Sequence, residues 1–98
     1  MTTEKRGETF VMREEEEAPI AFTTFLAGFA ASALIHLGVT VHPETGKLEQ
    51  DLQSARQTLD VLSMLREKTR GNLTAEEDHF FESLLTDLRI RYLEATKP

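Results

Sequence analysis

The sequence contains no cysteine and no tryptophan, and its 98 residues include only three prolines and five glycines. The lack of cysteine excludes disulfides, thiolate metal sites and cysteine nucleophiles, and it fits the reducing cytoplasm, where we expect the protein to reside. Few prolines and glycines, together with 40% hydrophobic and 29% charged residues, favour a folded helical chain. No stretch alternates apolar and polar residues for long enough to predict a strand. These absences predict an all-α protein.

Basic residues are also scarce, because 11 Lys and Arg stand against 17 Asp and Glu, for a net charge of -6. Such a chain would be repelled by a phosphate backbone, so we expect no nucleic-acid partner. Residues 1–19 include the run Glu14–Glu17 and predict a flexible acidic tail. The tail lacks the basic start and apolar core of an export signal. Residues 20–95 predict a single helical domain.

Three segments of this domain carry helical patterns. The first, about residues 21–37, is apolar on all sides and is followed by Gly38, a residue typical of helix C-termini. The second begins near Leu48 and ends with Gly71 as its C′ residue, and the third begins at Thr74, whose spacing to Glu77 predicts a capping box. The core positions expected in these two helices are Leu48, Leu52, Ala55, Leu59 and Leu62, then Phe80, Phe81, Leu84, Leu85, Leu88 and Tyr92. The result is a three-helix domain with an apolar first helix.

Residues 20–41 contain no Lys, Arg, Asp or Glu, and their number suits a bilayer. Their richness in Ala, Thr, Ser and Gly, and the apolar stripes of the later helices, favour a buried helix instead. The alternative is a membrane-attached protein in which residues 20–41 span or lie in the bilayer. Because two amphipathic helices cannot enclose a third that is apolar all round, we expect homo-oligomerisation, first of all a homodimer, to complete the fold. The expected interface comprises Phe25, Ala27, Gly28, Ala31, Ser32 and Ile35.

Side chains that suggest chemistry are few, and we expect no catalysis and no cofactor. His36, His42 and Glu44 resemble metal ligands, but their spacing matches no known ligand pattern, so a metal-dependent enzyme using His36 and His42 is only a third interpretation. Residues 43–47 resemble part of a phosphate-binding loop, yet Leu48 follows the lysine where Ser or Thr is needed, and a turn is expected. Candidate partner-binding residues are His36, His42, Arg89 and Arg91.

Longer stretches of the chain are similar to a family of short bacterial proteins. The similarity lies in residues 24–25, 32–38, 43–47, 55–60, 67–74 and 88–92, and it extends over about residues 20–93. On these stretches the chain resembles the family called domain of unknown function 1844. The resemblance implies one compact bacterial domain with a variable tail, and it carries no activity, cofactor or catalytic residue. The expected function is therefore that of a self-associating interaction or adaptor protein with an unknown protein partner.

Overall fold

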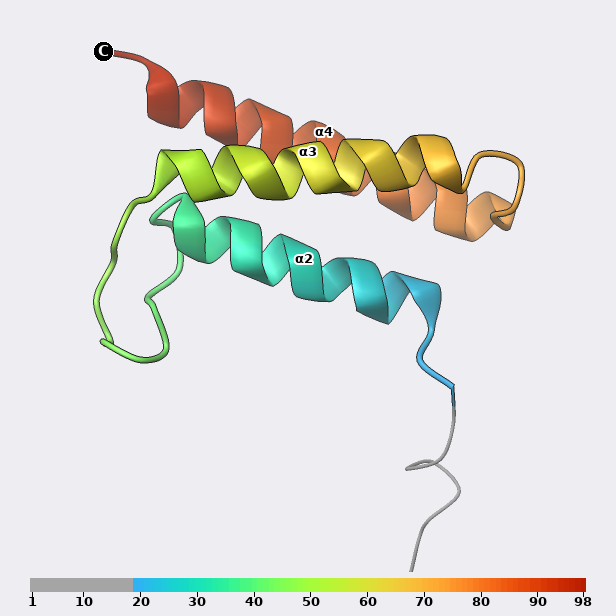
Figure 1. Cartoon of the computed structure of the whole chain (residues 1–98), viewed down its shortest axis with the longest axis horizontal. Helices are drawn as coiled ribbons and strands as arrows, with labels where there is room; N and C mark the ends of the chain where they lie inside the picture. The colour runs from blue at the N-terminus through green and yellow to red at the C-terminus, as the bar shows by residue number, and fades with distance from the viewer. Residues whose placement is uncertain (1–18) are drawn as a thin grey trace, which may run out of the picture.

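The computed structural model describes residues 19–98, which form three helices and no strand. The helices are α2 (Phe22–His36), α3 (Leu52–Lys68) and α4 (Ala75–Thr96). Successive helices run in opposite directions, so α2 and α4 are parallel to each other and antiparallel to α3 (Figure 1). The all-α, three-helix prediction is confirmed for this part of the chain. The predicted tail, apart from Pro19, lies outside the described residues.

The core lies where the three helices meet, and each helix contributes to it. Its largest fully buried side chains are Phe81, Leu26, Leu62, Leu85 and Leu88. Phe81 packs edge-on against Phe22, with ring centroids 5.9 Å apart, and the Arg66 guanidinium lies 5.4 Å from the centroid of the Phe81 ring. Burying a side chain of this size stabilises the fold by about 2–3 kcal/mol. The predicted stripes of α3 and α4 supply most of this core, with Leu48 as the exception.

Helix α2 ends in a Schellman motif at the glycine that the sequence indicates. The Gly38 N–H donates to the Ile35 carbonyl at 3.0 Å, and the Val39 N–H donates to the Leu34 carbonyl at 3.0 Å. Gly38 has φ +80°, a conformation that a side chain disfavours. The predicted end of the first helix is therefore confirmed.

Helix α3 begins at Leu52, so the predicted start near Leu48 is wrong. Asp51 is its N-cap, and the carboxylate accepts from the Ser54 N–H at 3.1 Å and the Ser54 hydroxyl at 2.8 Å. The Asp51 N–H donates to the His36 carbonyl at 2.7 Å, which ties the start of α3 to the end of α2. Leu48 has helical spacing but remains 61% exposed in the connecting loop. At the other end the C-cap is Thr69, so Gly71 lies two residues beyond it instead of at C′.

Helix α4 begins with the predicted capping box. The Glu77 N–H donates to the Thr74 hydroxyl at 3.1 Å, and the Thr74 N–H donates to the Glu77 carboxylate at 2.9 Å. Three acidic residues in this first turn, Glu76, Glu77 and Asp78, suit the positive end of the helix dipole. The start of α4 is thus set by residues three positions apart in the chain, so the sequence alone is enough to locate it.

Candidate interaction surface

The free face of α2 carries no Lys, Arg, Asp or Glu and combines Phe25 and small residues with the hydroxyls of Thr24 and Ser32. The two neighbouring helices bury only Leu26 and Ala33 of this helix completely. The six residues expected at an oligomer interface fall on one half of the helix at 100° per residue: Phe25, Ala27, Gly28 and Ala31 are exposed, and Ser32 and Ile35 are partly buried. The structure therefore brings these residues together on one open face, and the interface itself stays a prediction.

This face is hollowed along one edge, on the side of Phe25 and Phe29. A shallow depression of about 260 Å³ is lined by Phe25, Gly28, Phe29 and Ser32. The rings of Phe25 and Phe29 lie edge to face with centroids 5.2 Å apart. They line the depression beside the position where Gly28 has no side chain. A Cβ added at Gly28 would meet no atom within 4 Å. The depression has the shape and the chemistry to receive apolar side chains.

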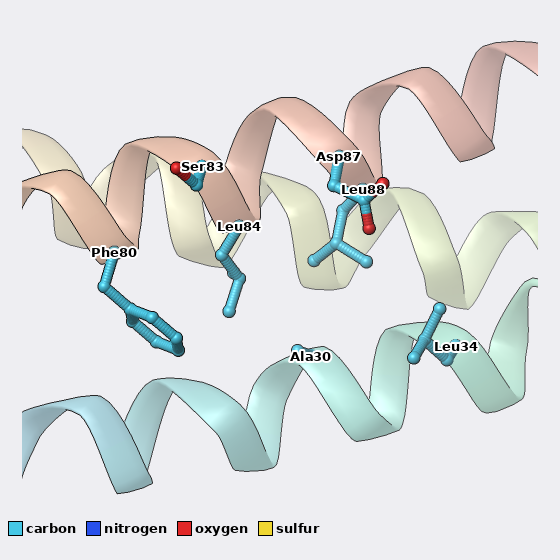
Figure 2. Close-up of a pocket in the computed structure, with 7 residues that line it drawn as sticks. All are labelled: Ala30, Leu34, Phe80, Ser83, Leu84, Asp87 and Leu88. Atoms are coloured by element: carbon cyan, nitrogen blue, oxygen red, sulfur yellow. The ribbon is translucent and has the colours of Figure 1, made fainter.

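A second apolar hollow lies between α2 and α4. Its volume is about 290 Å³, and its lining consists of Ala30, Leu34, Phe80, Ser83, Leu84, Asp87 and Leu88. Figure 2 shows Phe80 and Leu84 extending from α4 toward Ala30 on α2. The carboxylate of Asp87 lies at the rim, 3.0 Å from Nε of Arg91. The sequence alone does not reveal this groove, because the groove depends on how α2 and α4 are placed relative to each other.

A third hollow lies between α3 and α4 and is more polar. It measures about 420 Å³ and is lined by Leu52, Gln53, Arg56, Gln57, Asp60 and Tyr92. None of the three hollows is lined by the predicted partner-binding residues His36, His42, Arg89 and Arg91.

The two arginines of that set are held within the fold. Arg89 donates to the Ser63 hydroxyl at 2.9 Å and so joins α4 to α3. Arg91 donates to the Asp87 carboxylate at 3.0 Å, the pair that i,i+4 spacing on a helix makes available. Both guanidinium groups therefore already make hydrogen bonds within the chain.

The loop between α2 and α3 carries the predicted turn and the candidate His42, whereas the candidate His36 is the last residue of α2. The His42 carbonyl accepts from the Gly46 N–H at 2.7 Å, and the Glu44 N–H donates to Nδ1 of His42 at 3.2 Å. Within residues 19–98, no three His, Cys, Asp or Glu side chains are grouped in a way that could hold a metal ion. The geometry gives the metal interpretation no support.

Charge pairs are concentrated on α3 and α4. Arg66 donates to Asp78 at 2.7 Å and to Glu82 at 3.1 Å, linking the end of α3 to the start of α4. The hydrogen bond from Arg66 lowers the pKa of Asp78, and the same bond raises the pKa of Arg66. At the other end of α3, the hydrogen bonds from Ser54 lower the pKa of Asp51. Asp51 lies at the junction of α2 and α3, where its N–H donates to the His36 carbonyl.

The membrane alternative was tested by length and apolarity. Helix α2 has 15 residues, fewer than the roughly 20 that a bilayer requires. No helix among residues 19–98 is both long and apolar enough to cross a membrane. The spanning form of the alternative therefore has no helix to carry it.

Comparison with known proteins identifies a family for this chain. A family model with the description "Domain of unknown function (DUF1844)" matches residues 19–94, a range that includes α2, α3 and nearly all of α4. No curated protein and no solved structure matches the chain.

Proposed function

The chain belongs to the family Domain of unknown function (DUF1844), a description that names no activity, and on that premise we propose that it is a non-catalytic interaction protein that forms a homodimer through α2. The observation that carries the proposal is an open helix face without a single charge. In this proposal, the protein partners of the chain bind the assembled dimer.

Charge favours a second copy as the occupant of this face. The chain carries a net charge of -6, so two copies repel each other unless they meet where charge is absent. Residues 20–41 are the long stretch that meets this condition. A contact between two copies of α2 places no carboxylate or ammonium group in the interface, and no buried ion has to be compensated.

Gly28 gives a second reason. Glycine inside a helix costs about 0.5–1 kcal/mol relative to alanine, and here no neighbouring atom explains its presence, since a Cβ would meet nothing within 4 Å. Glycine is useful where another backbone approaches closely. A second α2 crossing at Gly28 is such an approach.

The choice of protein as the partner class follows from charge and from the hollows. An acidic chain does not attract the phosphate backbone of a nucleic acid. A helix that lies on a membrane surface is normally anchored by Lys or Arg on its polar side, and α2 contains neither. The groove between α2 and α4 and the polar hollow between α3 and α4 remain open for protein side chains.

Two variants with matched chemistry test the proposal. Phe25 on α2 is 44% exposed and Ile90 on α4 is 54% exposed, so glutamate at either position is tolerated by the single chain. We expect Phe25→Glu to raise the dimer dissociation constant about 100-fold or more, because each copy would bury an unpaired charge. Ile90→Glu should leave it unchanged.

The measurement is molar mass by light scattering behind size exclusion, with helix content checked by circular dichroism. The proposal predicts a dimer for the unmodified protein and for Ile90→Glu, and a monomer for Phe25→Glu with its helices intact. A dimer that survives Phe25→Glu, or an unmodified protein that is monomeric at every concentration, would contradict it. A monomer that sediments with lipid vesicles would favour the membrane-surface alternative.

A further inference from the structure

The loop between α2 and α3 protrudes beyond the free face of α2. Figure 1 shows it, in green, extending past the end of α2 on the side away from α3 and α4. Its own hydrogen bonds order it, including the His42 N–H to the Lys47 carbonyl at 2.8 Å. Three apolar side chains of this loop, Val39, Val41 and Leu48, nevertheless remain exposed. An ordered loop that keeps apolar side chains in water calls for a covering surface.

Exposed apolar side chains are also found at the opposite end of α2. Ile20 just before the helix is 78% exposed, and Phe25 follows in its first turns. Neither is covered by α3 or α4. Both ends of the free face therefore expose apolar side chains that a second surface could cover.

We infer, building on the proposed self-association, that two copies pair with their α2 helices antiparallel, so that the loop of each copy covers the first turn of the other's α2. Each covered site is then made by two chains and is incomplete in either one alone. The contact is isologous, as in most soluble homodimers, with the same residues used twice.

The spacing of residues along α2 supports the antiparallel register. Gly28 and Ala31, at the middle of the face, are centred between residues 29 and 30. Thr24 and Ile35 share that centre, and so do Ile20 and Val39. A two-fold axis through this point sets small residues against small residues at the crossing. It also brings the apolar N-terminal end of one α2 to the apolar loop of the other.

The parallel arrangement fails on shape. It would bring the two protruding loops to the same end of the pair, where they compete for the same space (Figure 1). In it, Ile20 and Phe25 of each copy would lie beside their own counterparts, and neither loop would reach the first turn of the other's α2. Opposed helix dipoles favour the antiparallel arrangement by a small further amount.

The absence of native cysteine allows a direct test by disulfide cross-linking. Thr24→Cys and Ile35→Cys are made separately, one with a tag that changes its mass, then mixed and mildly oxidised. In the antiparallel pair, residue 24 of one copy faces residue 35 of the other, while identical residues are about 16 Å apart along the axis. A disulfide needs Cα atoms within about 7 Å.

The antiparallel pair predicts a cross-linked heterodimer in the mixture and no cross-link in either variant alone. Homodimeric cross-links of Thr24→Cys and of Ile35→Cys would instead demonstrate the parallel arrangement and overturn the inference. So would a dimer by mass in which no combination cross-links, although self-association would stand. A monomer by mass would refute the proposed function together with this inference.

The role of the loop has its own matched pair. Leu48 in the loop and Leu93 on α4 are both 61% exposed, so glutamate at either position disturbs the single chain equally little. The covered-loop arrangement predicts that Leu48→Glu raises the dimer dissociation constant about tenfold, while Leu93→Glu leaves it unchanged. Equal constants for the two variants would remove the loop from the interface.

Discussion

Helices α3 and α4 carry apolar stripes beside charged faces, whereas α2 is uncharged around its whole circumference. The other helices cover most of the stripes of α3 and α4, and the remaining faces of these two helices carry Arg, Glu and Asp side chains. These faces also expose single apolar residues, which are Val61, Met64, Ile90 and Leu93. Helix α2 has the same number of neighbours but more apolar surface than they can cover. Among the described residues, the apolar side chains of α3 and α4 that face the core are therefore well covered, whereas the outer face of α2 is left in water.

The first way to sharpen this comparison is to remove one aromatic side chain from each side. Phe81 is fully buried against all three helices, so Phe81→Ala should lower the free energy of unfolding by about 3–5 kcal/mol through the cavity that it leaves. Phe25→Ala on the open face should cost the single chain about 1 kcal/mol or less. Urea denaturation of both variants at the same low protein concentration measures the difference. Equal losses would show that the two regions are not distinct.

The sequence already indicates much of this contrast. The capping box at Thr74, the end of α2 at Gly38 and the stripe from Phe81 to Leu88 are local signals, and the structure confirms them. The start of α3 could not be located from spacing alone, because Leu48 continues the leucine pattern. What excludes Leu48 from the helix is the cap at Asp51 and its bond to the His36 carbonyl, and that bond exists only after α2 and α3 have met.

The candidate surface likewise has features that the sequence reveals and features that depend on the fold. The lack of charge on the open face of α2 follows from composition, because residues 20–41 contain no Lys, Arg, Asp or Glu. The groove between α2 and α4 and the link from Arg66 to Asp78 and Glu82 depend on helix placement. The four partner-binding candidates follow from residue type alone. Residue type does not indicate which side chains already make hydrogen bonds within the folded chain.

A second prediction concerns Gly28, and its expected effect is smaller and of opposite sign. In the monomeric Phe25→Glu background, Gly28→Ala should raise the free energy of unfolding by about 0.5–1 kcal/mol, because alanine has the better helix propensity and its Cβ meets nothing. Thermal or urea unfolding followed by circular dichroism measures the gain. A loss of stability would reveal a constraint on Gly28 within the chain and would weaken the case for an intermolecular one.

The smallest expected effect is the acid response of the paired helices. The pKa of Asp78 is lowered from 3.8 by its hydrogen bond from Arg66, so the unfolded chain takes up a proton there before the folded chain does. The stabilising contribution is complete above the ordinary pKa and is lost as the pH falls from about 4 through the lowered value. Asp78→Asn should therefore flatten the decline in unfolding free energy below about pH 4. An unchanged slope would show that the link between α3 and α4 adds nothing to stability.

The open face of α2 is the central claim, and the mass of the untagged, unmodified protein in detergent-free buffer tests it most directly. Sedimentation or light scattering over a hundredfold range of concentration should show a species of twice the chain mass of 11.1 kDa, dissociating only on dilution. A species of 11.1 kDa throughout that range would contradict the account, because the apolar face of α2 would then stay in water without a partner.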